Sequence, residues 1–362
     1  MSTQPAPVVS VVLATHNRPR LLLDLLDGLR HQTMPADQFE VVVVDDGSET
    51  PVDDVVDPNS YPFALTLIRQ AGAGASSARH HGILRANGEI LVIVDDDMTL
   101  PPQFLAAHAE HHRRADEHVA VIGRYISPPD IQDKPLFERY HGLKWDQLTE
   151  RVGSGTITVN GTYLATGNTS MRRQDYLAAG GFDLDLARLE DLRLGLDLER
   201  IGVRLVYSSE AGSVHCSDHT DPSVWRGRQH LHGRLEKRIS DDLDSVASAD
   251  PWRYAFSLPM AGRLLCAVPV LTPRLATRLT PMLYAVASWF GRVGLERVAM
   301  RGCGVVWGWE FFSGVRQEYG SLRASWAGLR RYVAKAVRSG QADSVPGWIV
   351  RRWGRGEASC AG

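Results

Sequence analysis

The chain has 362 residues, 44% of them hydrophobic and 23% charged, which is typical of a globular protein with a substantial core. Its formal net charge of −2 provides no overall basic field, so we expect no nucleic-acid partner. The four cysteines show no Cys-x-x-Cys spacing, which argues against a zinc site and a disulfide framework. The chain also contains no uninterrupted apolar run of about 18 residues, as a membrane span would need. We therefore predict a cytoplasmic protein with one large domain and an appendage.

The first predicted unit is a strand, a loop and a helix. Residues 8–14 (VVSVVLA) are apolar except for Ser10, the pattern of a strand that is buried on both faces. Asn17 is expected to cap the following helix, and Pro19 suits its first turn. Leucines then recur on one helical face as far as Leu29. This order is typical of the start of an α/β domain.

Two further units repeat this order. Residues 39–44 (FEVVVV) predict a second buried strand, which ends in the pair Asp45 and Asp46. Residues 64–69 predict a third strand, and a loop of small residues leads to a helix at 76–86. The aspartate pair is consistent with an ordinary polar turn, since Asp is common in turns, and also with a binding site.

The fourth predicted strand, residues 90–94 (ILVIV), ends in three carboxylates, Asp95, Asp96 and Asp97. Two carboxylates about 4 Å apart repel by roughly 4 kcal/mol at an intermediate dielectric, so a rigid cluster needs a positive partner. Oxygen ligands suit Mg²⁺ or Mn²⁺, and these ions suit a substrate that carries phosphates. A polar turn is the alternative explanation for the triplet.

The alternation of strands and helices predicts a mainly parallel sheet with helices on both faces. Ligands of such sheets bind beyond the carboxyl ends of the strands. We therefore expect the segments that follow the strands to meet at one site, including Ala14, Thr15, Asp46, Arg79, Asp95, Asp96 and Asp97.

Together these motifs resemble glycosyltransferase family 2, which has the GT-A fold. The resemblance covers roughly residues 8–220 and includes SVVLATHNRP, FEVVVVDDGS, the segment that contains the Asp triplet, ATGNTSMRRQDYLAAGGFD and LEDLRLGLDLERIG. It implies that a nucleotide-diphosphate sugar is the donor and that a hydroxyl group is the acceptor. It places Ala14, Thr15, Asn17, Asp46, Arg79, Asp95 and Asp96 at the donor nucleotide. It also implies that Asp97 and His215 bind Mn²⁺ or Mg²⁺, with Asp218 and His219 as reserve ligands.

The pair Glu190 and Asp191 precedes an apolar pattern of helical period, so it is expected at a helix N-terminus. Acids there stabilise a helix whatever the function, which is the structural explanation. The resemblance implies instead that Asp191 is the general base of an inverting transfer, and that Glu190 orients it or binds the acceptor.

Residues 221–362 are expected to form a mostly helical extension to a catalytic domain at residues 1–220. The segment 322–337 predicts a basic amphipathic helix that contains Trp326, a pattern typical of a peripheral membrane surface and of a lipid-linked acceptor. Packing against the catalytic domain or a second subunit is the alternative. The string Q-x-x-R-W of processive membrane synthases is absent, so we expect a non-processive enzyme.

Two other functions remain open from the sequence. A sugar nucleotidyltransferase also uses carboxylates and a metal at a sheet edge, but its Gly-rich basic signature does not follow the first strand here. A catalytically silent nucleotide-sugar-binding protein would keep Asp46 and the triplet without needing Asp191.

Overall fold

The computed structural model describes residues 7–115, 118–243 and 249–338. The chain divides into two compact units. Residues 1–134 and 141–219 form the sheet unit, and residues 135–140 and 220–362 form the helical unit.

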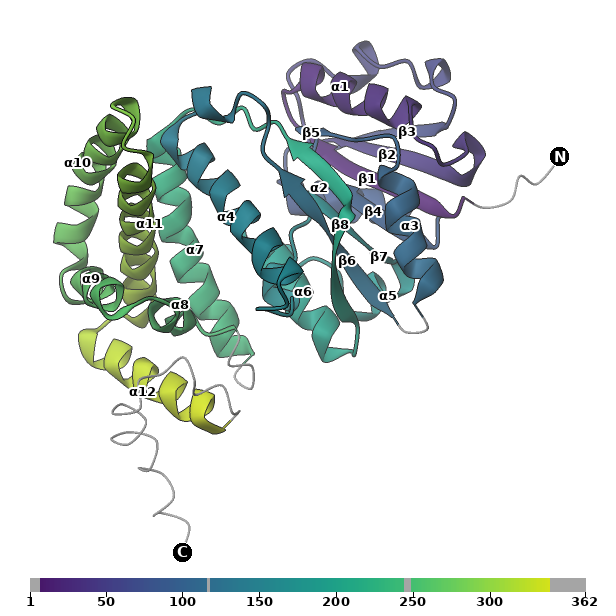
Figure 1. Ribbon diagram of the computed structural model, residues 1–362. Helices are drawn as coiled ribbons and strands as arrows, with labels where there is room; N and C mark the ends of the chain where they lie inside the picture. The colour runs from purple at the N-terminus through teal and green to yellow at the C-terminus, as the bar shows by residue number, and fades with distance from the viewer. Residues whose placement is uncertain (1–6, 116–117, 244–248, 339–362) are drawn as a thin grey trace, which may run out of the picture. The chain divides into compact units, whose positions relative to one another are not determined.

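The sheet unit is built on one mixed sheet with the strand order β3-β2-β1-β4-β7-β6-β8-β5 (Figure 1). Strands β1 to β4 are mutually parallel, as predicted, whereas β7 runs antiparallel to both β4 and β6, and β5 runs antiparallel to β8. The strands are β1 Val9–Thr15, β2 Phe39–Asp45, β3 Ala64–Arg69, β4 Ile90–Val94, β5 Met98–Thr99, β6 Val119–Ile126, β7 Asn168–Arg172 and β8 Arg204–His215.

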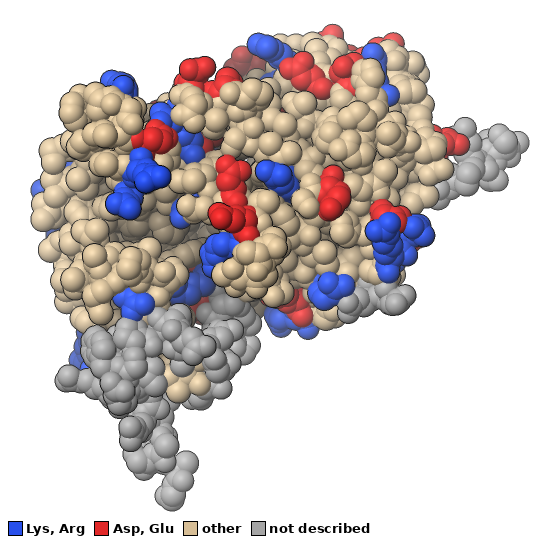
Figure 2. All heavy atoms as spheres, viewed as in Figure 1, with Lys and Arg blue, Asp and Glu red and all other residues tan. Residues whose placement is uncertain are grey.

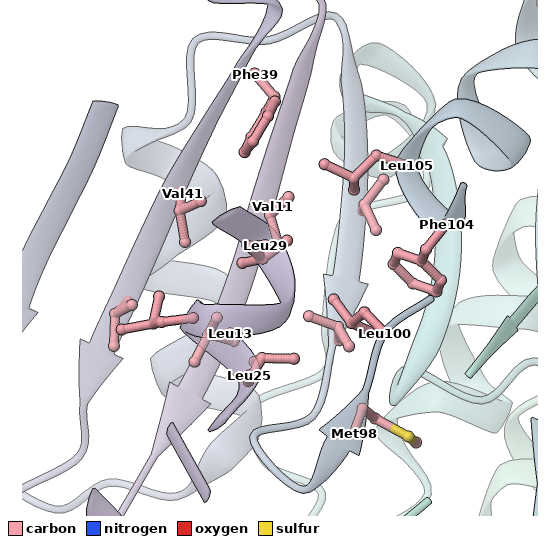
Figure 3. Packing of buried hydrophobic residues seen from close by; sticks show 14 of the residues in the cluster. Val11, Leu13, Leu25, Leu29, Phe39, Val41, Met98, Leu100, Phe104 and Leu105 are labelled. Carbon is pink, nitrogen blue, oxygen red and sulfur yellow. The ribbon is translucent and has the colours of Figure 1, made fainter. Parts of the chain in front are cut away.

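Helices cover both faces of this sheet. Alternate residues of a strand point to opposite faces, so Val11 and Leu13 of β1 pack on one side while Val12 packs on the other. The first side is covered by α1 (Pro19–Arg30) and α3 (Phe104–Arg114), and Figure 3 shows this packing. The second side is covered by α2 (Ala75–Arg85), α5 (Arg173–Ala178) and α6 (Glu190–Arg200). Helix α4 (Leu136–Gly153) and five short 3₁₀ segments complete the elements before residue 220.

Two local predictions are wrong. Asn17 does not cap α1, because the N-cap residue is Arg18 and it makes no side-chain cap bond. Asn17 instead adopts a left-handed φ of 55°, and its N–H donates to Ser48 Oγ at 2.9 Å, which ties the loop after β1 to the loop after β2. The pattern VRLVYS at residues 203–208 predicts a strand that ends at Ser208, but β8 continues to His215, so this histidine lies at a strand end.

The helical unit contains α7 (Pro222–Asp242), α8 (Trp252–Ser257), α9 (Met260–Leu271), α10 (Pro273–Arg292), α11 (Glu296–Tyr319) and α12 (Leu322–Arg338). Helices α7 and α11 approach closely through glycines, since a Cβ on Gly314 would lie only 2.0 Å from the carbonyl oxygen of His230. In α12, Val333 is buried in this unit while Trp326 stays 46% exposed. Among the described residues, no helix has the length and apolar character that crossing a membrane requires.

Candidate active site

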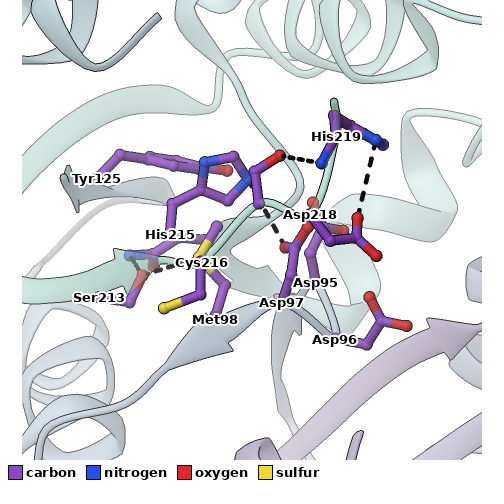
Figure 4. A network of polar contacts seen from close by, with 12 residues as sticks. Asp95, Asp96, Asp97, Met98, Tyr125, Ser213, His215, Cys216, Asp218 and His219 are labelled. Carbon is purple, nitrogen blue, oxygen red and sulfur yellow. Dashed lines mark hydrogen bonds and ion pairs between the residues drawn. The ribbon is translucent and has the colours of Figure 1, made fainter. Parts of the chain in front are cut away.

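The three carboxylates after β4 lie on the turn that leads to β5, facing the segment after β8 (Figure 4). Asp96 and Asp97 are buried, at 5% and 6% exposure. Thr15 Oγ1 donates to Asp96 Oδ2 at 2.8 Å, so the end of β1 contacts the triplet directly. Burial, followed by the charges of Asp95 and Asp96, raises the pKa of Asp97 to about 7.

Arg18 supplies positive charge to this cluster, and the sequence analysis did not identify it. Its Nη1 lies 3.1 Å from Asp96 Oδ1 and 3.4 Å from Asp97 Oδ2, while its Nη2 donates to Asp218 Oδ1 at 2.6 Å. The available signal was its place in the polar segment immediately after the first strand.

A candidate cation site lies between Asp97 and His215. Asp97 Oδ1 is buried and has no hydrogen-bond partner among the described residues, and His215 Nε2 lies 3.7 Å from it. Burial lowers the pKa of His215, so its ring is neutral near pH 7 and has a lone pair to offer. An unsatisfied carboxylate oxygen beside a neutral imidazole fits Mn²⁺ or Mg²⁺, with Mn²⁺ the better match for a nitrogen ligand.

Asp46 directly follows β2, and its N–H donates to the backbone oxygen of Thr15 at 2.9 Å. Its carboxylate accepts hydrogen bonds from Gln70 Nε2 and from the backbone N–H groups of Ala73 and Gly74, each at 2.8 Å. The Gly-rich loop before α2 is therefore folded onto this carboxylate. The neighbouring Asp45 stabilises the turn after β2, because its carboxylate accepts a hydrogen bond from the Ser48 N–H and pairs with Arg69. Ala14, which is also predicted at the donor nucleotide, is half-buried near the end of β1.

Arg79 joins the triplet to the start of α6. Its guanidinium is buried and pairs with Asp95 through Nη2 and with Glu190 Oε1 through Nη1, at 3.2 Å for the second pair. Both terminal nitrogens are thus occupied by carboxylates of this chain. The predicted contact of Arg79 with the nucleotide remains a prediction.

Asp191 begins α6 beside Glu190, and this confirms the predicted helix N-terminus. The Leu192 N–H donates to Asp191 Oδ1 at 2.7 Å. Burial, followed by the charge of Glu190, raises the pKa of Asp191 to about 7.

Tyr125 of β6 connects the two groups of carboxylates. It is buried, and its pKa is raised well above the ordinary value by burial first, then by Asp95 and by Asp191. The charges of both carboxylates therefore act on its hydroxyl group. Tyr125 also stacks on Trp145 of α4, with ring centroids 4.2 Å apart. The sequence analysis identified neither aromatic residue, since both belong to stretches without a recognisable motif.

This topology, with carboxylates gathered at the ends of its strands, is that of the GT-A class of glycosyltransferase folds. The structure is similar to that of a mannosyltransferase from Pyrobaculum calidifontis, solved in complex with GDP-Man and Mn²⁺. The match covers 83% of this chain and 87% of the mannosyltransferase, with a TM-score of 0.56 and 21% sequence identity. The family model described as Glycosyl transferase family 2 matches residues 10–178. This match supports the resemblance to glycosyltransferase family 2 that the motifs indicated.

Two curated relatives are about a quarter identical to this chain over the regions that match. A validoxylamine A glucosyltransferase from Streptomyces hygroscopicus is 27% identical over 237 residues, which are 59% of this chain and 56% of that protein. A glucosyl-dolichyl phosphate glucuronosyltransferase from Haloferax volcanii is 26% identical over 261 residues, covering 68% of this chain and 81% of the relative. The chain thus spans little more than half the length of the first of these.

Proposed function

We propose that this protein is an inverting, non-processive glycosyltransferase that moves a sugar from a nucleotide-diphosphate sugar to an acceptor hydroxyl, with Mn²⁺ or Mg²⁺. The acceptor would belong to a glycan, a glycolipid or a small metabolite. The proposal rests above all on one observation, the buried Arg79 that pairs with both Asp95 and Glu190. This contact links the carboxylates suited to the donor with the helix that provides Asp191. We assign catalysis to residues 1–220.

At the donor, the roles follow from charge and burial. Asp97 and His215 would hold the cation, which when bound supplies positive charge to the departing diphosphate. Arg18 provides a fixed guanidinium beside the same carboxylates. The Asp46 carboxylate, held by backbone N–H groups, still has acceptor capacity for the imide N–H of uracil, thymine or guanine.

At the acceptor, Asp191 would take the proton of the attacking hydroxyl. A base is most effective when its pKa is near the working pH, and the pKa of about 7 meets that condition. One base suffices for a single displacement at the anomeric carbon, which inverts its configuration. Glu190 and Arg79 would hold the start of α6 in position.

The test is incubation with Mn²⁺ and a panel of nucleotide-diphosphate sugars. Slow release of the nucleoside diphosphate supports the proposal. Release of pyrophosphate would support a nucleotidyltransferase instead, and binding without turnover would support a silent binding protein. Asp191→Asn should abolish release while donor binding persists, whereas loss of binding in this variant would refute the role given to Asp191.

A further inference from the structure

The surface of α9 and α10 is apolar and basic, with no acidic residue. From Leu258 to Leu295 the sequence contains four arginines and no Asp or Glu. Along α10 and at the residue that follows it, large apolar side chains recur every three, four or seven residues, so they lie on one helical face. We call this face the apolar stripe, and each of its members is about half exposed: Leu275, Met282, Val286, Trp289 and Val293. In Figure 2 the part of the surface formed by α9 and α10 is mostly uncharged, with isolated basic side chains.

A cavity of about 890 Å³ adjoins the first member of this stripe. It lies within the helical unit, between the start of α10 and the end of α11, and Leu275 is part of its wall. Three arginines are among the residues that line it, Arg274, Arg278 and Arg316. None of the described residues that line it is acidic.

Two further observations indicate that an anion fits this cavity. Ser313, which is 1% exposed, is one of the residues that line it, and its Oγ is buried with no hydrogen-bond partner among the described residues. The N-terminus of α10 also forms part of the wall, with no side-chain cap at Thr272 and no acid in its first turn. Pro273 has no N–H and the Leu275 N–H donates to Thr272 O at 3.1 Å, so the helix start contributes little beyond its dipole. The three arginines and the unpartnered hydroxyl are the groups that suit a phosphate.

The apolar stripe decides which phosphate compound fits. A soluble phosphate would leave five large apolar side chains in water. A membrane lipid would instead place its phosphate in the cavity, while the neighbouring lipids cover the apolar stripe. Helices with an apolar face, flanking basic residues and aromatic side chains lie in the interface of anionic bilayers. We propose that the cavity binds the phosphate group of an anionic membrane lipid and that the apolar stripe inserts into the same lipid surface. The proposal concerns only the helical unit and does not depend on the glycosyltransferase activity.

Vesicle flotation of the full chain tests this directly. We expect binding to vesicles of phosphatidylcholine mixed with an equal part of phosphatidylglycerol, little binding to phosphatidylcholine alone, and weaker binding at high salt. The double variant Arg274→Gln/Arg278→Gln should lower the partition coefficient about thirtyfold, since each basic residue at an anionic surface contributes roughly fivefold. The matched control Arg20→Gln/Arg85→Gln removes the same charge from exposed positions of the sheet unit and should change partitioning much less. Equal losses of vesicle binding in the two double variants would show that only general electrostatic attraction acts, and would refute lipid binding in the cavity.

The stripe and the source of the phosphate are tested separately. Met282→Ser/Trp289→Ser should also reduce binding to the anionic vesicles, while thermal melts establish that the variant is folded. Two results would indicate that the cavity binds a soluble phosphate and would refute the lipid proposal: unchanged vesicle binding of this variant, or complete release of the protein from vesicles by inorganic phosphate. A concentration-dependent dimer in the absence of vesicles, abolished by the same variant, would assign the stripe to a second copy and refute the proposal.

Discussion

Arg79 Nη1 and Glu190 Oε1 lie 3.2 Å apart, although the two residues are 111 positions apart in the sequence. Since the same guanidinium also pairs with Asp95, the start of α6 is tied to the end of β4 by one buried side chain. The position of Asp191 relative to the triplet therefore depends on Arg79.

Arg79→Met should lower both stability and activity. Removing one partner of a buried ion pair leaves uncompensated charge and costs about 3–5 kcal/mol. Arg79→Lys should recover part of the stability but not the activity, because one ammonium cannot bridge two carboxylates as a planar guanidinium does. Thermal melts and turnover measure the two effects. Arg113→Lys, in an exposed pair with Glu110, is the control and should be neutral in both.

The turnover rate should fall on the acid side of neutrality. With the pKa of Asp191 at about 7, the carboxylate is charged above that pH and protonated below it, so a base is lost as the pH decreases. We expect kcat/KM to fall about tenfold for each pH unit well below the pKa. The pKa of Asp97 is also raised to about 7 in the ion-free protein, so donor binding must be measured over the same range. A flat pH profile at constant donor binding would contradict the role of Asp191.

Asp97→Asn should abolish the response to Mn²⁺. The substitution removes the charge of the carboxylate whose Oδ1 is unsatisfied, so cation-dependent donor binding should weaken at least tenfold. Titration of Mn²⁺ against a thermal shift with nucleoside diphosphate measures this. His215→Ala should weaken the Mn²⁺ response more than the Mg²⁺ response, because Mg²⁺ prefers oxygen ligands. Unaltered Mn²⁺ dependence in both variants would place the cation elsewhere.

Asp46→Asn should reduce nucleotide affinity through two effects. The new amide lacks one acceptor oxygen for the Ala73 and Gly74 N–H groups, and it places a donor near the imide N–H of a base. We expect about tenfold or greater loss in the affinity for uridine or guanosine diphosphate, measured by calorimetry. Asp45→Asn is the comparison, since it should lower the melting temperature while sparing nucleotide affinity in the folded protein.

Gly314→Ala should destabilise the helical unit. A Cβ there would meet the His230 carbonyl oxygen at 2.0 Å, so α7 and α11 must separate, at a cost of about 1–3 kcal/mol or more. Gly227→Ala on α7 is a matched control, because nothing lies within 4 Å of its added Cβ. That change should stabilise the helix by about 0.5–1 kcal/mol. Equal melting temperatures for the two variants would contradict the close approach.

The sequence predicted the parallel half of the sheet well and the antiparallel half poorly. Strand β4 is apolar and buried at every residue, so it begins and ends at the predicted residues, and the partly exposed edge strand β3 also has the predicted bounds. Strand β7 has the sequence NTSMR and gives no such signal, although Asn168 and Ser170 are fully buried. Their polar groups are satisfied by His108, which contacts Ser170 Oγ and Asn168 Oδ1 at 2.9 Å each. Partners so distant in sequence cannot be inferred from a local pattern.

The site shows the same division. Thr15, Asp96 and Asp97 come together as expected, because the ends of parallel strands meet at one edge. The ion pairs made by Arg18 and Arg79 were not predicted, since they depend on side-chain reach and on which neighbouring charges lack partners. Tyr125 and Trp145 depend on how α4 packs, which their sequence alone does not specify.

Arg18 is a counter-ion within the chain for the carboxylates of Asp96 and Asp97. An internal counter-ion already balances part of the acidic charge, so the loop after β4 does not need an external ion to hold its shape. Under the proposed function, Asp97 and His215 would hold a divalent ion beside this guanidinium, and the ion would add positive charge for the diphosphate of the donor on a surface that is already assembled.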